Sequence, residues 1–325
     1  MNIHQWVIVV VLFLFSCKKS EDNNPSNTID PPNKPAQLKS TIVSSSRVVL
    51  VWADSSSNED GFIIERKGIN NTYQTVGTTN SNTIVFEDAQ IQTDAQYTYR
   101  VFAFNAAGRS AQPTNETSVN IPNINLTSIT IGTQIWSAKN LEVTQYLNGD
   151  PIPQVSNPQE WATLTTGAWC WYDNDSTTNA PVYGKLYNWY AVNDSRGLAP
   201  DGWHLPSEND WNKLVLSIDV NADTTCMISC TQSSIAGGEM KETNLTHWLS
   251  PNNGATNSTG FAALPGGGRD TDGTYFYLGN YGNWWSTGTY DASSAFIRTI
   301  SYSGASFKKE VSYKRLGYSV RVVKN

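Results

Sequence analysis

The sequence predicts a chain of several domains, in which an all-β sandwich is followed by a larger α+β domain. Three observations support this prediction. A short apolar run opens the chain, residues 36–122 carry strand patterns that alternate every second residue, and residues 127–325 combine helix starts with short strands. A length of 325 residues suits two or three domains, since a domain usually has about 100–200 residues.

Composition and charge exclude one class of partner. The formal net charge is −6 and no basic block occurs, which argues against nucleic acid as a partner. Only 15% of the residues are charged, whereas Ser, Thr, Asn and Gly are abundant and Trp occurs 12 times. We therefore expect β-rich and loop-rich domains outside the cytoplasm rather than a helical cytoplasmic enzyme.

The chain opens with a targeting segment. Residues 6–15 form an apolar run with the length of a signal-peptide core, too short to span a bilayer. The run ends in Leu-Phe-Ser-Cys, which resembles a bacterial lipobox, so residues 1–17 are expected to be a lipoprotein signal peptide with Cys17 acylated. The n-region departs from the pattern because it holds no Lys or Arg. An ordinary cleaved signal peptide with an incidental Cys is the alternative. Acyl chains on Cys17 would anchor the protein to a membrane, at about 0.8 kcal/mol per buried CH₂.

Residues 18–35 are expected to form a Pro/Asn-rich tether. Four prolines stiffen and extend this segment. The mixed charge of residues 18–22 resembles the surface-export signals of Bacteroidetes lipoproteins, although a solvated tether explains it equally well. We predict an outer-membrane lipoprotein exposed at the cell surface, a location in which disulfides are permitted.

Residues 36–122 have the pattern of an all-β sandwich, with strands expected at 48–52, 61–67, 83–86 and 97–105. Trp52 and the run Tyr-x-Tyr-x-Val-x-Ala-x-Asn from Tyr97 resemble a fibronectin type III domain. The resemblance makes Tyr97 the tyrosine-corner residue, whose hydroxyl bonds back to the backbone. It also implies a spacer or docking unit, followed by a linker at residues 123–126.

Residues 127–325 carry two helix starts and several short strands. Ser207 is expected to cap a helix whose apolar face recurs at Trp211, Leu214, Val215 and Ile218. Another helix is expected from Asn157 to about residue 167, with Pro at its first position and Glu at its third. Helical spacing of aromatic residues predicts a further helix over 183–192. Strands are expected at 128–136, 275–278, 284–286, 295–302, 306–312 and 318–323.

Seven different short motifs occur along this second region. They are Gly-x-Gln-x-Trp from Gly132, Trp-Cys-Trp-Tyr from Trp169, Tyr-Gly-Lys-Leu-Tyr-Asn-Trp from Tyr183, Gly-Trp-His-Leu-Pro from Gly202, Gly-Phe-x-Ala-Leu-Pro-Gly-Gly from Gly260, Trp-Trp-Ser from Trp284 and Gly-Tyr-Ser-Val-Arg from Gly317. Together they resemble the Fibrobacter succinogenes major paralogous (FISUMP) domain. The resemblance implies a fold like that of C-type lectins, distantly shared with formylglycine-generating enzymes, and it implies no activity. The structural signature residues are expected to be Trp203, His204, Pro206, Trp211 and Arg321.

Cysteine pairing stays open at this level. Cys170, Cys226 and Cys230 allow at most one bridge, and the last two could close a small loop. Some members of the family that this region resembles carry Cys at the positions of Ala199 and Val322. If those two cysteines form a disulfide in relatives, this chain lacks it. No histidine lies at ligand spacing from a cysteine pair, which argues against zinc.

The sequence offers weak candidates for catalysis. His204 and His247 are the only histidine bases in the second region, and no serine lies in a Gly-x-Ser-x-Gly turn. Their contexts favour structural roles, and Cys226 and Cys230 lie in a variable insertion rather than in a formylglycine-type active site. We therefore expect no enzyme. The Gly-Gly-Gly-Arg run from Gly266 lacks the ending of a phosphate loop and fits a tight turn.

We expect no cofactor, with a bound calcium ion as the alternative. Asp173 with Asp175 and Asp270 with Asp272 place oxygen ligands at alternate positions, but no distant Glu completes a calcium loop. Polar turns capped by their own side chains explain the same residues.

Aromatic residues are the most informative group for function. Exposed aromatic faces beside amides are suited to sugar rings, so candidate ligand-binding residues are Tyr275, Tyr277, Tyr281, Trp284 and Trp285, with Asp270 and Asp272. Strand alternation predicts one of the two tryptophans in the core and the other at the surface. The favoured function is binding or adhesion at the cell surface, with polysaccharide or a surface protein as the ligand. A structural role in an envelope complex is the alternative, and a hydrolase or oxidase ranks third.

Overall fold

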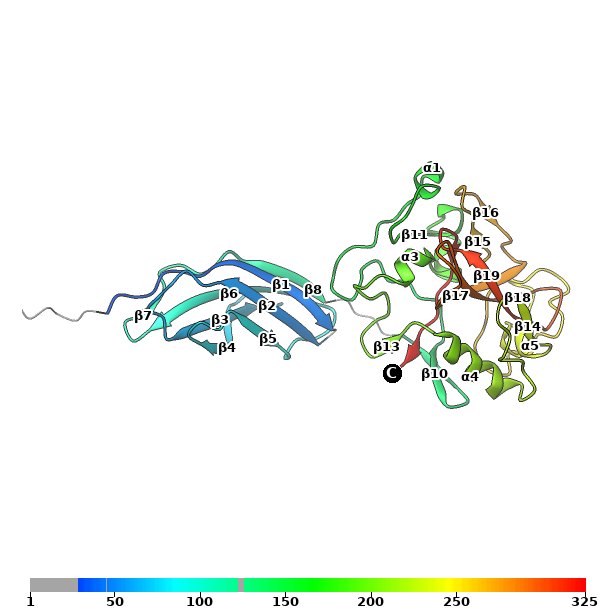
Figure 1. The fold of residues 1–325 in the computed structure, drawn as a ribbon, viewed down its shortest axis with the longest axis horizontal. Helices are drawn as coiled ribbons and strands as arrows, with labels where there is room; N and C mark the ends of the chain where they lie inside the picture. The colour runs from blue at the N-terminus through cyan, green and yellow to red at the C-terminus, as the bar shows by residue number, and fades with distance from the viewer. Residues whose placement is uncertain (1–28, 45, 122–125) are drawn as a thin grey trace, which may run out of the picture.

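The computed structural model describes residues 29–44, 46–121 and 126–325 (Figure 1). Cys17, the signal peptide and most of the tether lie outside the described residues. Strands β1–β8 form one unit, and the remaining elements form a second unit. Within the described ranges no helix is long and apolar enough to cross a membrane.

The first unit is a sandwich of two antiparallel sheets. Its smaller sheet has the order β1-β2-β5, and the larger has the order β4-β3-β6-β7 with β8 also paired to β6. The strands are β1 (Ala36–Ser44), β2 (Arg47–Ala53), β3 (Gly61–Lys67), β4 (Gln74–Asn80), β5 (Val85–Asp88), β6 (Ala95–Asn105), β7 (Gly108–Arg109) and β8 (Thr117–Ile121). Trp52 on β2 and Phe62 on β3 meet edge to face at 5.4 Å between the sheets. The predicted sandwich is confirmed.

The predicted tyrosine corner is present. The hydroxyl of Tyr97 accepts a hydrogen bond from the backbone N–H of Gln92 at 3.0 Å. The four strands expected from the sequence match β2, β3, β5 and β6 within two residues at each end. Strands β1, β4, β7 and β8 were not predicted. Strand β4 gives a weak signal because it is mostly polar and has no buried position.

The second unit holds three sheets and five short helices. Their orders are β13-β21-β10-β9, β11-β12-β20-β15-β16 and β14-β19-β18-β17. The strands are β9 (Ser128–Ile131), β10 (Gln134–Ser137), β11 (Trp169–Cys170), β12 (Leu186–Asn188), β13 (Trp203–His204), β14 (Cys230–Ser233), β15 (Gly268–Arg269), β16 (Tyr275–Phe276), β17 (Tyr281–Thr289), β18 (Ser294–Ser301), β19 (Phe307–Tyr313), β20 (Gly317–Tyr318) and β21 (Val323–Lys324). The helices are α1 (Pro158–Trp161), α2 (Ala180–Tyr183), α3 (Trp189–Val192), α4 (Glu208–Ile218) and α5 (Ala236–Met240), with a 3₁₀ turn at Tyr172–Asn174.

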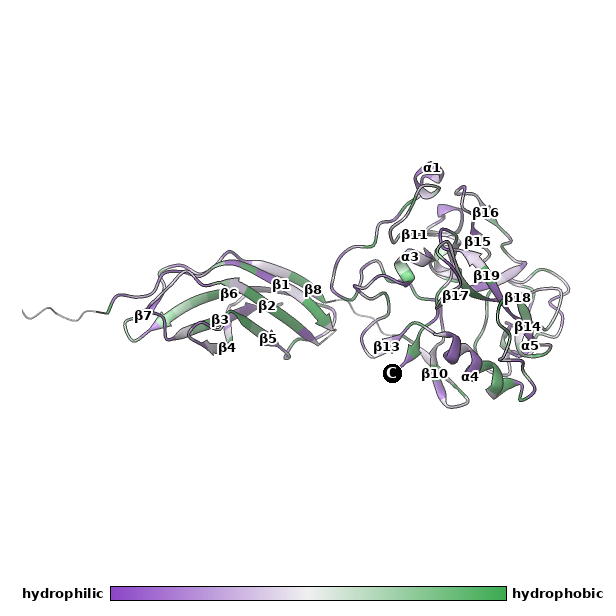
Figure 2. Ribbon diagram, viewed as in Figure 1, coloured by the Kyte–Doolittle hydropathy of each residue, from purple (hydrophilic) through white to green (hydrophobic). Residues whose placement is uncertain are grey.

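Helix α4 begins where its cap predicts. The Ser207 hydroxyl accepts from the N–H of Asp210, and the Asp210 carboxylate accepts from the N–H of Ser207 at 2.9 Å, which completes a capping box. Trp211, Leu214 and Val215 are fully buried. In Figure 2 the first turn of α4 is purple and its second half is green, as expected for a helix that starts at the surface and packs onto the core.

The predicted helix over 183–192 is wrong in its first half. Helix α2 ends at Tyr183, Gly184 takes a left-handed φ of 72°, and the chain then forms β12 before α3 begins. Strand β12 lies between β11 and β20, so pairing on both edges outweighs the helical spacing. The helix capped by Asn157 starts as predicted but ends at Trp161. The strand expected at 318–323 consists of the short strands β20 and β21.

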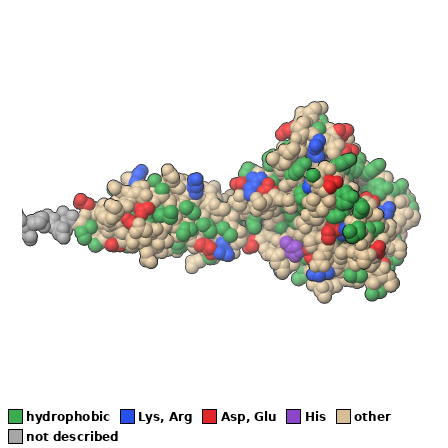
Figure 3. Space-filling view, in the orientation of Figure 1, with side chains coloured by type: hydrophobic (Ala, Val, Ile, Leu, Met, Phe, Trp, Pro, Cys, Tyr) green, Lys and Arg blue, Asp and Glu red, His purple; other side chains and the backbone are tan. Residues whose placement is uncertain are grey.

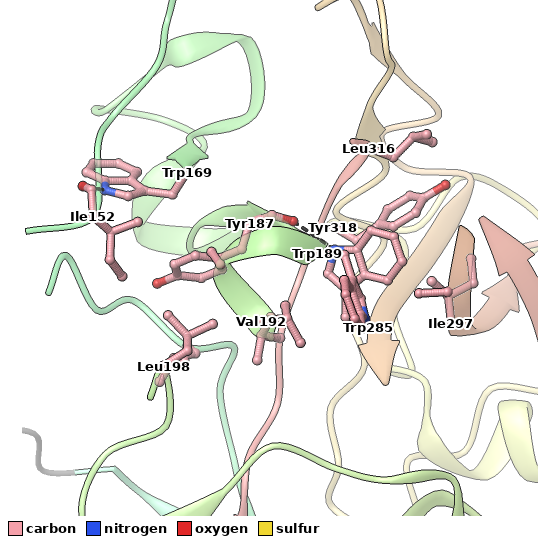
Figure 4. Close-up of a cluster of buried hydrophobic side chains, with 14 of the residues drawn as sticks. Ile152, Trp169, Tyr187, Trp189, Val192, Leu198, Trp285, Ile297, Leu316 and Tyr318 are labelled. Carbon is pink, nitrogen blue, oxygen red and sulfur yellow. Dashed lines mark hydrogen bonds between the residues drawn. The ribbon is translucent and has the colours of Figure 1, made fainter. Parts of the chain in front are cut away.

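Buried aromatic side chains pack against both faces of the sheet β14-β19-β18-β17. Trp284 packs on one face with Phe261 and the α4 cluster, and Trp285 packs on the other face with Tyr318 at 5.1 Å (Figure 4). The two tryptophans therefore alternate as predicted. The expectation that one is at the surface is wrong, because Trp284 is 0% and Trp285 is 1% exposed.

Buried cations fasten the loops of this unit. The ammonium of Lys241 donates to the carbonyls of Asn253, Ser301 and Gly304 at 2.8–3.0 Å. The guanidinium of Arg269 donates to the carbonyls of Val155, Ser156 and Gly273. Each cation satisfies the hydrogen-bonding capacity of three backbone carbonyls, so one side chain fixes segments far apart in the sequence.

The cysteines divide into one bridge and one thiol. Cys226 and Cys230 form a disulfide that closes a small loop before β14, and Cys170 is free and buried. Ala199 and Val322 both pack in the apolar core around Trp285.

Candidate functional site

One groove opens on the face of the long sheet that carries Trp285. It has a volume of about 410 Å³ and lies between the sheet and the segment that joins β16 to β17. Alternate residues of two strands line it, because successive side chains of a strand point to opposite faces. They are Ile297, Thr299 and Ser301 on β18, with Lys308, Glu310 and Ser312 on β19.

Three aromatic rings form the rim of the groove. The Tyr277 ring lies 5.3 Å from Phe276 and 5.2 Å from Tyr281. The contacts continue inward, since Phe276 meets Tyr318 edge to face at 6.2 Å. The rim is thus supported by rings that lead into the core.

Tyr277 is held at the surface by its backbone. Its φ is 61°, a left-handed conformation that is rare for an aromatic residue, and its side chain is 59% exposed. The carbonyl of Tyr277 accepts from the N–H groups of Asn280 and Tyr281 at 3.0 and 3.2 Å. Such strain commonly marks a functional position, because the surrounding structure must maintain it.

The floor of the groove is polar and ordered. The Thr299 hydroxyl lies 3.0 Å from Asn283 Oδ1 and 3.2 Å from Glu310 Oε2. Asn283 Nδ2 donates to the carbonyl of Gly267 at 3.1 Å, which fixes the amide. Lys308 is exposed at the edge and makes no ion pair with any residue that the structure describes. The floor therefore offers a fixed carboxylate and a free ammonium to a ligand.

The glycine-rich run supports this site rather than binding phosphate. Gly267 has a φ of 60°, and a Cβ there would collide with the backbone oxygen of Phe276. Its N–H donates to the carbonyl of Tyr281 at 2.9 Å. Arg269 is fully buried, and its donors are used by backbone carbonyls. A tight turn between strands was expected for this run, and its last two residues, Gly268 and Arg269, form strand β15 of the hairpin β15–β16.

The five aromatic residues predicted to bind a ligand separate into three groups. Tyr277 and Tyr281 line the groove. Tyr275 faces another cluster, where its ring lies 5.2 Å from Tyr172. Trp284 and Trp285 are buried, with their indole N–H groups bonded to Asn140 and to the Tyr187 carbonyl, so they are excluded as ligand contacts.

Three of the four aspartates considered as calcium ligands, Asp175, Asp270 and Asp272, cap turns with their own carboxylates. Asp272 Oδ1 accepts from the N–H and hydroxyl of Thr274, and Asp270 Oδ1 accepts from Thr271. Asp175 likewise accepts from Thr177 and Thr178, and these bonds hold the pKa of its carboxyl well below its usual range. Asp173 sits in the 3₁₀ turn with a φ of 52°. The described ranges hold no cluster of three or more His, Cys, Asp or Glu side chains suited to a metal.

His204 has polar neighbours at both ring nitrogens. Nδ1 lies 2.7 Å from Asn325 Oδ1, and Nε2 lies 3.4 Å from Asp210 Oδ2. Ser207 Oγ donates to the same carboxylate at 2.6 Å, so the serine bonds to the aspartate and not to the histidine. An acyl-transfer triad needs the histidine between the other two groups.

The other signature residues and His247 also make structural contacts. Trp203 pairs with Lys324 between β13 and β21, and the carbonyl of Pro206 accepts from the N–H of Thr287 at 3.0 Å. His247 Nδ1 lies 2.9 Å from Glu242, and its ring meets the edge of Tyr183.

The residues at the floor of the groove were not predicted from the sequence. Thr299, Lys308 and Glu310 lie on strands that were predicted within one residue of their bounds, at 295–302 and 306–312. Polar residues recur there at every second position, as in Lys308, Glu310 and Ser312. That alternation could have predicted a sheet face exposed to solvent.

Comparisons with known proteins agree with the two units. A family model described as the Fibrobacter succinogenes major domain matches residues 129–324. A fibronectin type III model matches residues 33–120. The combination indicates a cell-surface or binding-type protein.

Several solved structures are similar over part of the chain. Domains A168–A170 from titin are 23% identical, with a TM-score of 0.26 and coverage of 29% of this chain and 33% of that one. The FN1–FN3 domains of chicken CNTN1 are 17% identical, with a TM-score of 0.27 and coverage of 29% and 34%. A β-1,2-glucanase from Parabacteroides distasonis is 17% identical, with a TM-score of 0.26 and coverage of 30% and 14%. The chain spans roughly a third or less of the length of each of these structures.

Proposed function

The chain belongs to the Fibrobacter succinogenes major domain family, and we propose that it binds polysaccharide through the groove beside Tyr277 while a lipid on Cys17 anchors it at the outer membrane. It acts in this proposal as a binding or adhesion protein and not as an enzyme. The observation that carries the proposal is the exposed, backbone-fixed ring of Tyr277 over a polar floor.

The rim of the groove suits the apolar face of a sugar ring. The C–H groups of a pyranose pack on an aromatic face, and Tyr277 offers such a face without a large loss of side-chain freedom on binding. Tyr281 and Phe276 hold that ring on two sides. A bound sugar would therefore meet a surface that is already in place.

The floor of the groove suits the hydroxyl groups. Glu310 accepts hydrogen bonds, Lys308 donates them, and serine and threonine hydroxyls do both. The single carboxylate and the single ammonium balance in charge, which favours a neutral ligand. A volume of about 410 Å³ lies within the range of roughly 300–1,000 Å³ that is common for small-ligand sites.

The proposed display at the cell surface rests on the order of the segments. A lipid at Cys17, a proline-containing tether and a fibronectin type III module would hold the binding domain away from the membrane. On the face shown in Figure 3, Lys/Arg and Asp/Glu side chains form small separate groups among uncharged ones. Digestion of the protein on intact cells by added protease would support surface display, and complete protection would contradict it.

A screen of the full chain against neutral plant and bacterial oligosaccharides tests the binding function. The screen includes Tyr277→Ala and, as a matched control, Tyr290→Ala, another exposed tyrosine that lies outside the groove. We expect ligands that wild type and Tyr290→Ala bind and Tyr277→Ala loses, with and without Ca²⁺. No ligand in any arm contradicts the proposal, and a stoichiometric partner protein from solubilised envelopes would then favour a role in assembly.

A further inference from the structure

A second, smaller pocket lies apart from the groove. It has a volume of about 250 Å³ and is lined by Tyr190, Thr271, Ser293, Tyr313 and Arg315. These residues come from α3, the β15–β16 turn, the β17–β18 turn, the end of β19 and the turn after β19. None of the five described residues that line it is acidic, and one is a cation.

Backbone hydrogen bonds hold the walls of this pocket together. The N–H of Lys314 donates to the carbonyl of Ser293, and the N–H of Trp189 donates to the carbonyl of Lys314, both at 2.9 Å. The Lys314 ammonium stacks over Trp189 at 4.5 Å and donates to the carbonyls of Asp291 and Ala292. Three segments distant in sequence are thus fixed around one opening.

Arg315 has donors left over in this frame. One terminal nitrogen, Nη1, donates to the carbonyl of Ala162 at 2.6 Å, which anchors the guanidinium. Nε is buried and has no hydrogen-bond partner among the residues that the structure describes. Arg315 also makes no ion pair within the described ranges. The other terminal nitrogen, Nη2, makes no hydrogen bond within the described ranges, so a ligand would meet the guanidinium at its terminal nitrogens and not at the buried Nε. An anchored guanidinium with unused terminal donors is a site for a planar anion such as a carboxylate.

The rest of the pocket suits a sugar ring. Tyr313 is 62% exposed and Tyr190 is partly exposed, so both present aromatic surface, while Thr271 and Ser293 supply hydroxyls. The carboxylates of Asp270 and Asp291 lie in the adjoining turns, where they accept from Thr271 and Ser293. They do not line the pocket.

We propose that this pocket binds an acidic sugar residue of the uronic-acid class, with its carboxylate on Arg315 and its ring against Tyr313 and Tyr190. The inference rests on the proposed function, because it adds a second subsite to a polysaccharide-binding domain. The volume is slightly below the usual range for small-ligand pockets, which fits one monosaccharide unit rather than a longer stretch.

The test compares the affinity of the full chain for an oligogalacturonate and for the methyl ester of the same oligosaccharide. We expect at least tenfold tighter binding of the acid at low salt, weakening as salt rises. Arg315→Gln should bring the two affinities within threefold. Tyr313→Ala, which changes an exposed side chain, should weaken acid binding, and Tyr277→Ala should leave the preference for the acid intact.

Three results would overturn this inference. They are equal affinity of the wild-type protein for the acid and the ester, a preference that survives Arg315→Gln, and equally tight binding of an acidic peptide of the same charge. Circular dichroism checks that Arg315→Gln folds, and Arg315→Lys keeps the charge if it does not. Loss of neutral-sugar binding in Tyr277→Ala is read separately. A failure of this pocket alone is therefore distinguishable from a failure of the proposed function, in which no oligosaccharide binds at all.

Discussion

The Nε atom of Arg321 donates to Asn140 Oδ1 at 2.9 Å, and this contact lies at the centre of the second domain. The same oxygen accepts from the indole N–H of Trp284 at 2.9 Å. The other guanidinium nitrogens of Arg321 donate to the carbonyls of Ser137 and Phe261. Burial lowers the pKa of Arg321 to about 9. A fully buried cation with backbone and amide partners joins the first and last segments of the domain.

Asn140→Ala should destabilise the second domain by about 2–6 kcal/mol, because it leaves two buried donors unsatisfied at roughly 1–3 kcal/mol each. Ten of the 12 tryptophans lie in this domain, so urea unfolding followed by tryptophan fluorescence reports it. Asn221→Ala is the matched control, since Asn221 is exposed, and it should change stability by less than about 0.5 kcal/mol. An Asn140→Ala domain as stable as the control would contradict a central role for this contact.

Asp210→Asn should make the free energy of unfolding depend less steeply on pH at acidic pH. Burial raises the pKa of the Asp210 carboxyl, but hydrogen bonds from Ser207 and the nearby His204 outweigh it, and the net pKa is below its ordinary value. Stability from this group is therefore present above about pH 3.9 and is lost as pH falls through the folded pKa. Unfolding free energies measured from pH 6 to pH 2 should fall more steeply in wild type than in Asp210→Asn. Parallel pH dependences in the two proteins would show that protonation of Asp210 does not change the free energy of unfolding.

Cys170 should stay unreactive until the domain unfolds. Burial raises the pKa of its thiol to about 11, so the folded state holds the neutral form. Because the folded pKa lies above the ordinary value, stability from this group is present below about pH 9 and declines as pH rises toward 11. Labelling with a thiol reagent before and after denaturation should reveal one more thiol in wild type than in Cys170→Ala. Rapid labelling of Cys170 in the native protein would contradict its burial.

Tyr97→Phe should loosen the corner of the first module without unfolding it. The change removes the acceptor for the Gln92 N–H, and one lost hydrogen bond costs about 1 kcal/mol. Hydrogen exchange at the Gln92 amide should rise about fivefold, while amides of the second domain keep their rates. Unchanged exchange at Gln92 would mean that the hydroxyl contributes nothing there.

Local patterns predicted the fold best where one signal acted alone. The Ser207 cap and the apolar face of α4 could be predicted because the residues that form them lie close together in the sequence. The 183–192 segment was misassigned since its strand exists only through pairing with β11 and β20. Trp284 and Trp285 were assigned to opposite faces correctly, but the cover on the second face comes from Tyr187 and Tyr318, which the sequence does not place.

The sequence predicted the aromatic rim of the groove but not its polar floor. Tyr277 and Tyr281 were expected from their crowding with other aromatic residues, and the structure places both at the groove. Tyr275 belongs to the same stretch but turns toward Tyr172, because β16 pairs with β15 and fixes which side chain faces which way. The polar floor depends on the register of β17, β18 and β19, which brings Asn283, Thr299 and Glu310 together.

The most direct test of the account is the affinity of one neutral oligosaccharide ligand for wild type, Tyr277→Phe and Tyr277→Ala, measured by isothermal titration calorimetry. Tyr277→Phe keeps the aromatic face, so its affinity should stay within about threefold of wild type. Tyr277→Ala removes the face and should bind at least about tenfold more weakly, a loss of roughly 1.4 kcal/mol. Equal affinity of Tyr277→Ala and wild type would contradict the claim that this groove is where the protein holds its ligand.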